Sequence, residues 1–450
     1  MAITPASAGE LVPDGILRPL PTVVQHDPQV CPASMQDPVG IDQQRSQQAE
    51  AVAAPMPLQS SAPALSLEQL EEMALANNPA ITRAAAQVRA LRGKWVQVGL
   101  PPNPTIGYVG AEIGNDKAAG QQGGYVGQVY VTGGKLCLNR NIVFQEIRSA
   151  EQRLAARQHR VRTDVRLSYY SVLTAQRKLE LAKELVDVNS KAVKASQELL
   201  EAKEIPRAAL LQTRVQLSNA SVLQQRAQNQ WQASWRQLAA VVGQAASLEP
   251  RPLAGDIATL FDPLAWEEQL SRLTIESPEI AEAVAELQRT RWALDRACAE
   301  VRPNINTQVS VQFDDSTNDV VTGVQLGIAL PIWNRNQGGI RQAQADISAA
   351  RQNIERVELD LKQRLAEAFQ AYSDARVQVE NYANDILPKA KEIFDLVGEG
   401  YRQGEVGYLD LLAAQRTYSE ASLAQIEAQQ VLWQSTARIE GLLLDGSLQD

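Results

Sequence analysis

Apolar residues recur at helical spacing over a long stretch in the last third of the chain, residues 338–400. The apolar positions are Ala343, Ile347, Ala350, Ile354, Val357, Leu361, Leu365, Ala368, Tyr372, Ala375, Val379, Tyr382 and Ile386. Their mean step of about 3.6 residues is that of a straight α-helix, whereas a supercoiled pair needs about 3.5. The pattern therefore predicts one nearly straight helix, suited to the wall of a helical barrel, with a kink near Pro388.

A looser version of the same spacing predicts a second long helix over residues 139–203. Each long helix ends in a turn followed by a return helix, and Pro206 is suited to the first position of one return helix. Because both turns lie at the same distance from the strands described next, they should form two tips at one end of the molecule. The residues expected to dock a partner there are Glu204, Ile205, Pro206, Gly404, Glu405, Val406 and Gly407.

Two segments in the second half alternate between apolar and polar side chains, which predicts two β-strands joined by a polar loop at residues 315–319. The apolar face comprises Ile305, Val309, Val311, Phe313, Val324, Leu326, Ile328 and Leu330. Strands of about ten residues with this alternation are typical of transmembrane β-barrels, where the apolar side chains face lipid. A soluble sandwich hairpin alternates in the same way, so the pattern alone leaves both architectures open.

The chain repeats itself once. Pro79 and Pro278 are 199 residues apart in similar contexts, and Pro102-Asn103 recurs 201 residues later as Pro303-Asn304. A colinear series of matches indicates a duplicated unit of about two hundred residues. Each half is expected to contain a short helix, a medium helix, two strands, a long helix and a return helix.

The duplication predicts four segments of the chain. Residues 1–64 are rich in proline and are expected to form a disordered arm. Residues 65–248 and 249–444 are the two repeats, and 445–450 are a tail. Ser66, followed by Gln69, predicts a capping box at the start of the first ordered helix.

Two duplicated strand pairs make four strands per chain, too few to close a barrel. An open sheet edge in lipid would leave backbone groups without hydrogen bonds. If the strands cross a membrane, several chains must therefore supply them together, and three copies would give twelve strands. The predicted fold is thus mainly α with a small β part. If the strands cross a membrane, the duplicated helical hairpins form a trimeric α-barrel that continues into a 12-stranded transmembrane β-barrel.

Composition narrows the function further. Only 5% of the residues are aromatic, which argues against a thick globular core, and the net charge of −9 argues against nucleic-acid binding. The two histidines and three cysteines are isolated, so we expect no metal site, and no nucleophile–base pair, P-loop or GxGxxG is present. An enzyme and a cofactor are therefore not expected. No transmembrane helix is predicted and no signal peptide is visible.

Two stretches carry a resemblance to a known family. LPIWNRNQG at residues 330–338, and GYRQG at 400–404 followed by YLDLLAAQR at 408–416, resemble the TolC family of outer-membrane efflux proteins over about residues 65–444. The resemblance implies a homotrimer in outer-membrane lipid with its helical tunnel in the periplasm. It also implies docking to a periplasmic adaptor (membrane-fusion) protein and, through it, to an inner-membrane pump of the RND type. The first stretch is similar to the cobalt–zinc–cadmium branch, so the expected cargo is heavy-metal cations or drugs.

The same resemblance implies a gate at the periplasmic tips. Its residues are Tyr401, Arg402 and Asp410. Val406 stands where the family's best-known member has a gate arginine, and Ala413 replaces a second gate aspartate. The electrostatic latch is therefore not carried over intact.

A soluble or periplasmic coiled-coil adaptor without channel activity is the alternative interpretation, and the lack of a visible signal peptide favours it. An adaptor is expected to carry one helical hairpin between β-rich domains. Two hairpins and long amphipathic strands are predicted here, which favours the channel.

Overall fold

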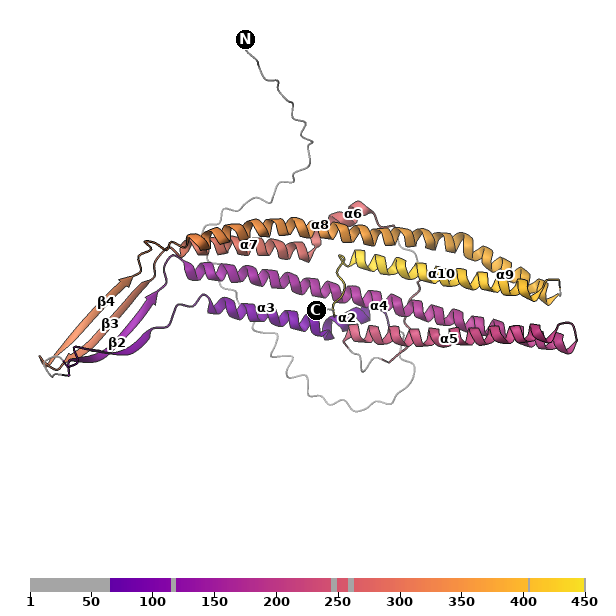
Figure 1. Ribbon diagram of the computed structural model, residues 1–450, viewed down its shortest axis with the longest axis horizontal. Helices are drawn as coiled ribbons and strands as arrows, with labels where there is room; N and C mark the ends of the chain where they lie inside the picture. The colour runs from indigo at the N-terminus through magenta and orange to yellow at the C-terminus, as the bar shows by residue number, and fades with distance from the viewer. Residues whose placement is uncertain (1–64, 115–118, 244–248, 258–262, 404, 449–450) are drawn as a thin grey trace, which may run out of the picture.

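The computed structural model describes residues 65–114, 119–243, 249–257, 263–403 and 405–448. These residues form an elongated molecule with a helical bundle in the middle, a sheet at one end and two helical tips at the other (Figure 1). The predicted arm, residues 1–64, lies outside the described residues. No helix among the described residues combines the length and the apolar character needed to cross a bilayer.

The same order of elements occurs twice along the chain. The first set is α2 (Leu67–Asn77), α3 (Pro79–Gln97), β1 (Thr105–Ala111), β2 (Gln121–Tyr130), α4 (Lys135–Glu201) and α5 (Arg207–Val242). The second set is α6 (Trp266–Glu276), α7 (Pro278–Ala299), β3 (Ile305–Asp314), β4 (Asp319–Ile328), α8 (Gln337–Asn381), the π-helix η2 (Tyr382–Ile386), α9 (Leu387–Arg402) and α10 (Tyr408–Glu440). The predicted mainly helical fold with a small β part is confirmed.

Local hydrogen bonds explain where the first helices begin. Ser66 Oγ accepts from the Gln69 backbone N–H at 3.3 Å, and Gln69 Oε1 accepts from the Ser66 N–H at 3.2 Å, which confirms the capping box. Asn78 caps α3 through Ala80 N–H at 2.9 Å, while its Nδ2 donates to the Val241 carbonyl at 2.9 Å. Asn78 therefore both starts α3 and fastens it to the end of α5.

Within α8 the predicted apolar stripe is the buried face, whereas its last member, Ile386 in η2, is 40% exposed. The buried residues of α8 all belong to that stripe: Ala343, Ala350, Leu361, Leu365, Tyr372, Ala375 and Val379. The last five of them pack with residues of α10 such as Leu432 and Ile439. A second core, around Val161, Val165 and Trp235, joins α4 and α5. Burial of a narrow stripe on each helix produces a thin layer of helices, as the scarcity of aromatic residues predicts.

The helix predicted as one element over residues 338–400 is interrupted. Five residues in π-helical conformation, Tyr382–Ile386, separate α8 from α9, and α9 continues at an angle to α8 (Figure 1). Pro388 lacks an N–H, and in an α-helix its ring would collide with the Asn384 carbonyl. The wider π turn removes that collision, so the expected kink takes the form of a π-bulge.

All four strands form one antiparallel sheet in the order β1-β2-β3-β4. The β2–β3 pair joins the two halves, with Tyr130 opposite Ile305 and Val126 opposite Val309. The outer edges of β1 and β4 pair with no other strand among the described residues. The loop between β3 and β4 is one residue shorter than predicted, because Asp319 already pairs with Asp314.

The core stripe generates a first prediction. Leu361 is 2% exposed, whereas Leu359, two residues earlier on the same helix, is 65% exposed. We expect Leu361→Ala to lower the free energy of unfolding by about 2–5 kcal/mol, because it leaves a cavity, and Leu359→Ala to have little effect. Unfolding followed by circular dichroism in detergent measures both variants. An equal loss for the two would contradict the assignment of the buried face.

Candidate functional site

One face of the sheet presents apolar side chains that nothing among the described residues covers. A single row across all four strands consists of Ile106, Val126, Val309 and Val324, joined by their pairing register. Their side chains are 82%, 52%, 48% and 71% exposed, respectively. A water-soluble sheet buries such a face against a second layer. This face is therefore apolar and open.

The opposite face is lined by glycine and polar residues. The next row pairs Gly107, Tyr125, Ser310 and Gly323. Ser310 and Asp314 are both only 9% exposed, so on β3 the polar residues are less accessible than their apolar neighbours. The apolar side chains of the sheet are thus more exposed than polar ones such as Ser310, the reverse of the usual arrangement in a water-soluble protein.

The residues predicted for the apolar face lie where the alternation placed them, with one exception. Ile305, Val309, Val311, Phe313, Val324, Leu326 and Ile328 are on β3 and β4, and all are exposed. The prediction that Leu330 belongs to the strand is wrong, because β4 ends at Ile328, before Pro331. Tyr108 and Tyr130 on β1 and β2 extend the face and were not predicted individually. The repeat offset of 201 residues could have identified Tyr108, because it relates Tyr108 to Val309.

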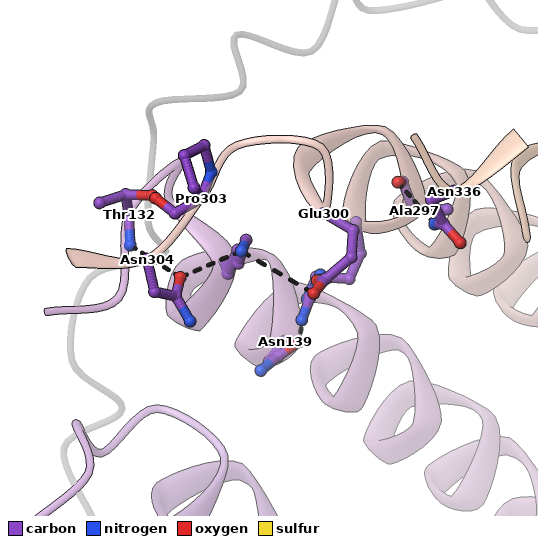
Figure 2. A network of polar contacts seen from close by, with 9 residues as sticks. Thr132, Asn139, Ala297, Glu300, Pro303, Asn304 and Asn336 are labelled. Atoms are coloured by element: carbon purple, nitrogen blue, oxygen red, sulfur yellow. Dashed lines mark hydrogen bonds and ion pairs between the residues drawn. The ribbon is translucent and has the colours of Figure 1, made fainter. Parts of the chain in front are cut away.

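A polar network joins the sheet to the helices (Figure 2). Lys135, at the start of α4, has a side chain only 5% exposed. Its Nζ donates to Asn304 Oδ1 at 3.0 Å and lies 3.9 Å from Glu300 Oε1. Thr132 Oγ1 donates to the Pro303 carbonyl at 2.5 Å. These contacts tie the exit from β2 to the entrance of β3, and so connect the two halves where the sheet meets the bundle.

Arg296 extends this network along α7. Its Nε donates to Asn139 Oδ1 at 2.8 Å, and its Nη1 donates to Glu300. The hydrogen bond from Arg296 holds the pKa of the Glu300 carboxyl below its usual value. Glu300 therefore stays ionised and supplies a negative charge near the buried ammonium of Lys135.

The first tip is the turn between α4 and α5. Lys203 adopts a left-handed conformation, with φ of 61°. The Lys203 N–H donates to the Leu200 carbonyl at 3.0 Å and the Glu204 N–H to the Leu199 carbonyl at 2.9 Å, which is a Schellman motif. Pro206 is the N-cap of α5 rather than its first residue, because its ψ of 153° is still extended. Glu204 and Pro206 are exposed and Ile205 is half-buried, so the predicted residues do form an accessible turn.

The second tip is the turn between α9 and α10. The Gly400 carbonyl accepts from the Glu405 N–H at 2.8 Å and from the Val406 N–H at 3.4 Å. The Val406 side chain packs over Gly400, where a Cβ would lie 3.1 Å from Val406 Cγ2. Glu405 and Gly407 are exposed, while Gly404 lies outside the described residues.

The predicted gate residues all lie at this second tip. The Asp410 carboxylate accepts from the Gly407 N–H at 3.2 Å and so caps α10. Tyr401 contacts Tyr408 instead, with ring centroids 6.2 Å apart. Arg402 is the last residue of α9, and its side chain is outside the described part of the structure. Tyr408 was not predicted; burial, with a smaller contribution from Tyr401, raises the pKa of its hydroxyl. Asp410 is thus already hydrogen-bonded to the backbone of its own chain.

No group of three histidine, cysteine, aspartate or glutamate side chains that could hold a metal ion occurs among the described residues. The arrangement offers an open apolar face, a polar face behind it and two exposed tips at the far end. These are features of a protein that assembles with other molecules.

Comparisons with known proteins identify relatives of this chain among membrane and efflux proteins. A family model described as outer membrane efflux protein matches residues 70–244 and 270–443. The cobalt-zinc-cadmium resistance protein CzcC of Cupriavidus metallidurans is 24% identical over 379 residues, covering 84% of this chain and 90% of that protein. A membrane protein from Pseudomonas aeruginosa superimposes with a TM-score of 0.72 at 18% identity, covering 88% of this chain and 97% of the other. A crystal structure of CusC gives a TM-score of 0.70 at 19% identity, covering 88% and 98%.

The junction network generates a second prediction. Asn304→Ala removes the acceptor of Lys135 and leaves a buried ammonium without its nearest partner. We expect the free energy of unfolding to fall by about 1–3 kcal/mol. Asn304→Asp keeps an acceptor at the same position, so its thermal midpoint should stay near that of the wild type. If both variants behaved alike, the hydrogen bond from Lys135 would not be what stabilises the junction.

Proposed function

Because this chain belongs to the outer membrane efflux protein family, we propose that three copies of it form a passive exit duct for small solutes. The observation that carries the proposal is the sheet with its exposed apolar face, polar opposite face and two unpaired edges. Such a sheet satisfies its backbone groups in lipid only when it is closed by copies of itself. The protein acts in the outer membrane, with its helical tunnel in the periplasm.

The proposed barrel contains twelve strands, four from each protomer. The free edge of β1 in one protomer would pair with the free edge of β4 in the next. This closure leaves the apolar face toward lipid and the face with Ser310 and Gly323 toward the lumen. Twelve strands are enough for an open lumen. The family matches in both halves also support the division into repeats at residues 65–248 and 249–444.

The proposed cargo is heavy-metal cations, with drugs as the second candidate. The CzcC relative is named for resistance to cobalt, zinc and cadmium, which favours metals. A duct of this kind needs no dedicated metal site, since an inner-membrane pump, here proposed to be of the RND type, selects the cargo. A periplasmic adaptor would connect pump and duct by docking at the two tips, Glu204–Pro206 and 404–407.

The proposed gate lies at the second tip, where Tyr401, Arg402 and Asp410 of the three protomers would narrow the resting pore. Because Asp410 also caps α10, its charge and its hydrogen bond have separate effects that substitutions can distinguish. An enzymatic role has no support from this family or from the residues near the tips. The adaptor alternative is not favoured either, because the family model spans both hairpins.

The barrel proposal predicts opposite effects for two neighbouring residues of β4. Val324→Arg places a charge on the lipid face, which costs about 2–4 kcal/mol per strand near the bilayer midplane. We expect it to abolish heat-sensitive trimers in outer-membrane fractions. Gln325→Arg, on the other face, should preserve the trimers and shift single-channel selectivity toward anions. Equal tolerance of both substitutions would contradict the proposed orientation of the sheet.

The gate proposal predicts a difference between loss of charge and loss of the cap. Asp410→Asn keeps an oxygen that can accept from Gly407 N–H but removes the charge, whereas Asp410→Ala removes both. If the Asp410 charge and the Tyr401 hydroxyl narrow the pore, both substitutions, and Tyr401→Phe, should raise single-channel conductance in planar bilayers. Only Asp410→Ala should also destabilise α10, by about 1 kcal/mol. Unchanged conductance in all three variants would refute the gate.

A further inference from the structure

The segment that leads from β4 into α8 is apolar and strongly exposed. Leu330 is 67%, Ile332 58% and Trp333 85% exposed, and Trp333 is the most exposed large apolar side chain among the described residues. An exposed indole next to two exposed aliphatic side chains is unfavourable in water. Contact with an apolar surface would therefore stabilise this segment.

The backbone of the same segment is hydrogen-bonded within itself. The Ile332 N–H donates to the Leu330 carbonyl at 2.9 Å, and Gln337 Nε2 donates to the Trp333 carbonyl at 2.9 Å. Arg335 Nε donates to the Pro331 carbonyl at 3.3 Å. In water these groups would be satisfied by solvent, but near hydrocarbon each unpaired one costs several kcal/mol. Three backbone carbonyls of the segment are thus paired within it, while its apolar side chains are exposed.

This exposed segment continues the apolar face of the sheet. Tyr130, Ile305 and Ile328 form the last row of that face, on the side nearer the helices. Tyr130 and Ile328 are each 56% exposed. Trp333 follows five residues after Ile328, between β4 and α8. The end of the sheet from which β4 leads into α8 is the one that meets the bundle (Figure 1). A lipid surface that covers the sheet would therefore end close to the segment in the chain.

The chemistry of the segment favours the lipid–water boundary over the hydrocarbon interior. Tryptophan is enriched at that boundary because its ring is apolar and its N–H is polar. Arg335, two residues further on, is exposed and can pair with a lipid phosphate.

We propose that residues 330–335 anchor the duct at the periplasmic surface of the outer membrane. Leu330, Ile332 and Trp333 enter the lipid at the level of the headgroups, and Arg335 faces the phosphates. The anchor sets the depth of the barrel and holds the start of α8 at the membrane surface. This inference rests on the proposed function, because it requires the sheet to lie in lipid.

Fluorescence quenching in phosphatidylcholine vesicles tests the anchor. Emission from Trp333 is obtained as the difference between the wild-type trimer and Trp333→Phe, which cancels the other tryptophans. Lipids brominated near the headgroup should quench this difference more strongly than lipids brominated near the ends of the acyl chains. Quenching by aqueous iodide alone, or by none of these agents, would overturn the proposal, since Trp333 would then lie in water or against another copy.

A control separates this inference from the barrel proposal. Val324→Trp, made in the Trp333→Phe background, places a reporter in the middle of β4. If the sheet spans the bilayer, lipids brominated near the chain ends should quench it more than shallow ones. Quenching at position 324 without quenching at Trp333 would overturn the anchor alone. Absence of quenching at both positions would overturn the barrel together with the anchor.

Discussion

The need to pair every backbone N–H and C=O group in lipid governs the structure of this protein. One chain contributes a four-stranded sheet, and no strand in the described part of the chain pairs with the outer edges of β1 and β4. Neither edge can remain open in a membrane, so the proposed barrel closes the sheet with copies of itself. The duplication supplies part of this backbone pairing within the chain, because β2 of the first repeat pairs with β3 of the second along its whole length. The rest is left to assembly.

Close contacts at the junction between the sheet and the helices connect the arrangement of the strands to that of the helical tunnel. Gly133 and Gly134 both have positive φ angles, which lets the chain turn sharply from β2 into α4. A Cβ on Gly133 would lie 2.8 Å from Arg302 Cδ, so the two halves approach closely at this point. The buried ammonium of Lys135 then links α4 to Asn304 before β3. Strand pairing and helix packing are therefore coupled through a small set of polar contacts.

At the other end of the molecule, the helices are joined by compact turns rather than by long loops. Each turn hydrogen-bonds its own backbone, through the Leu199 carbonyl in one hairpin and the Gly400 carbonyl in the other. The second hairpin differs by its π-helical segment, Tyr382–Ile386, which changes the direction of α9 relative to α8. The Asp410 carboxylate caps α10 at this tip, so it contributes to the stability of that helix.

The sequence by itself determined the features that depend on local backbone geometry. The helical spacing identified the buried stripe of α8, the alternation identified β3 and β4, and the repeat offset identified the matching elements of the first half. Only the tertiary structure decided which face of the sheet is open, because a period of two is the same whichever face is buried. The π-helical segment before Pro388, the role of Asp410 as a cap and the position of Leu330 beyond β4 were also decided there. Each depends on neighbours that spacing along the chain does not reveal: the Asn384 carbonyl, the Gly407 N–H and the end of the β3–β4 pairing at Ile328.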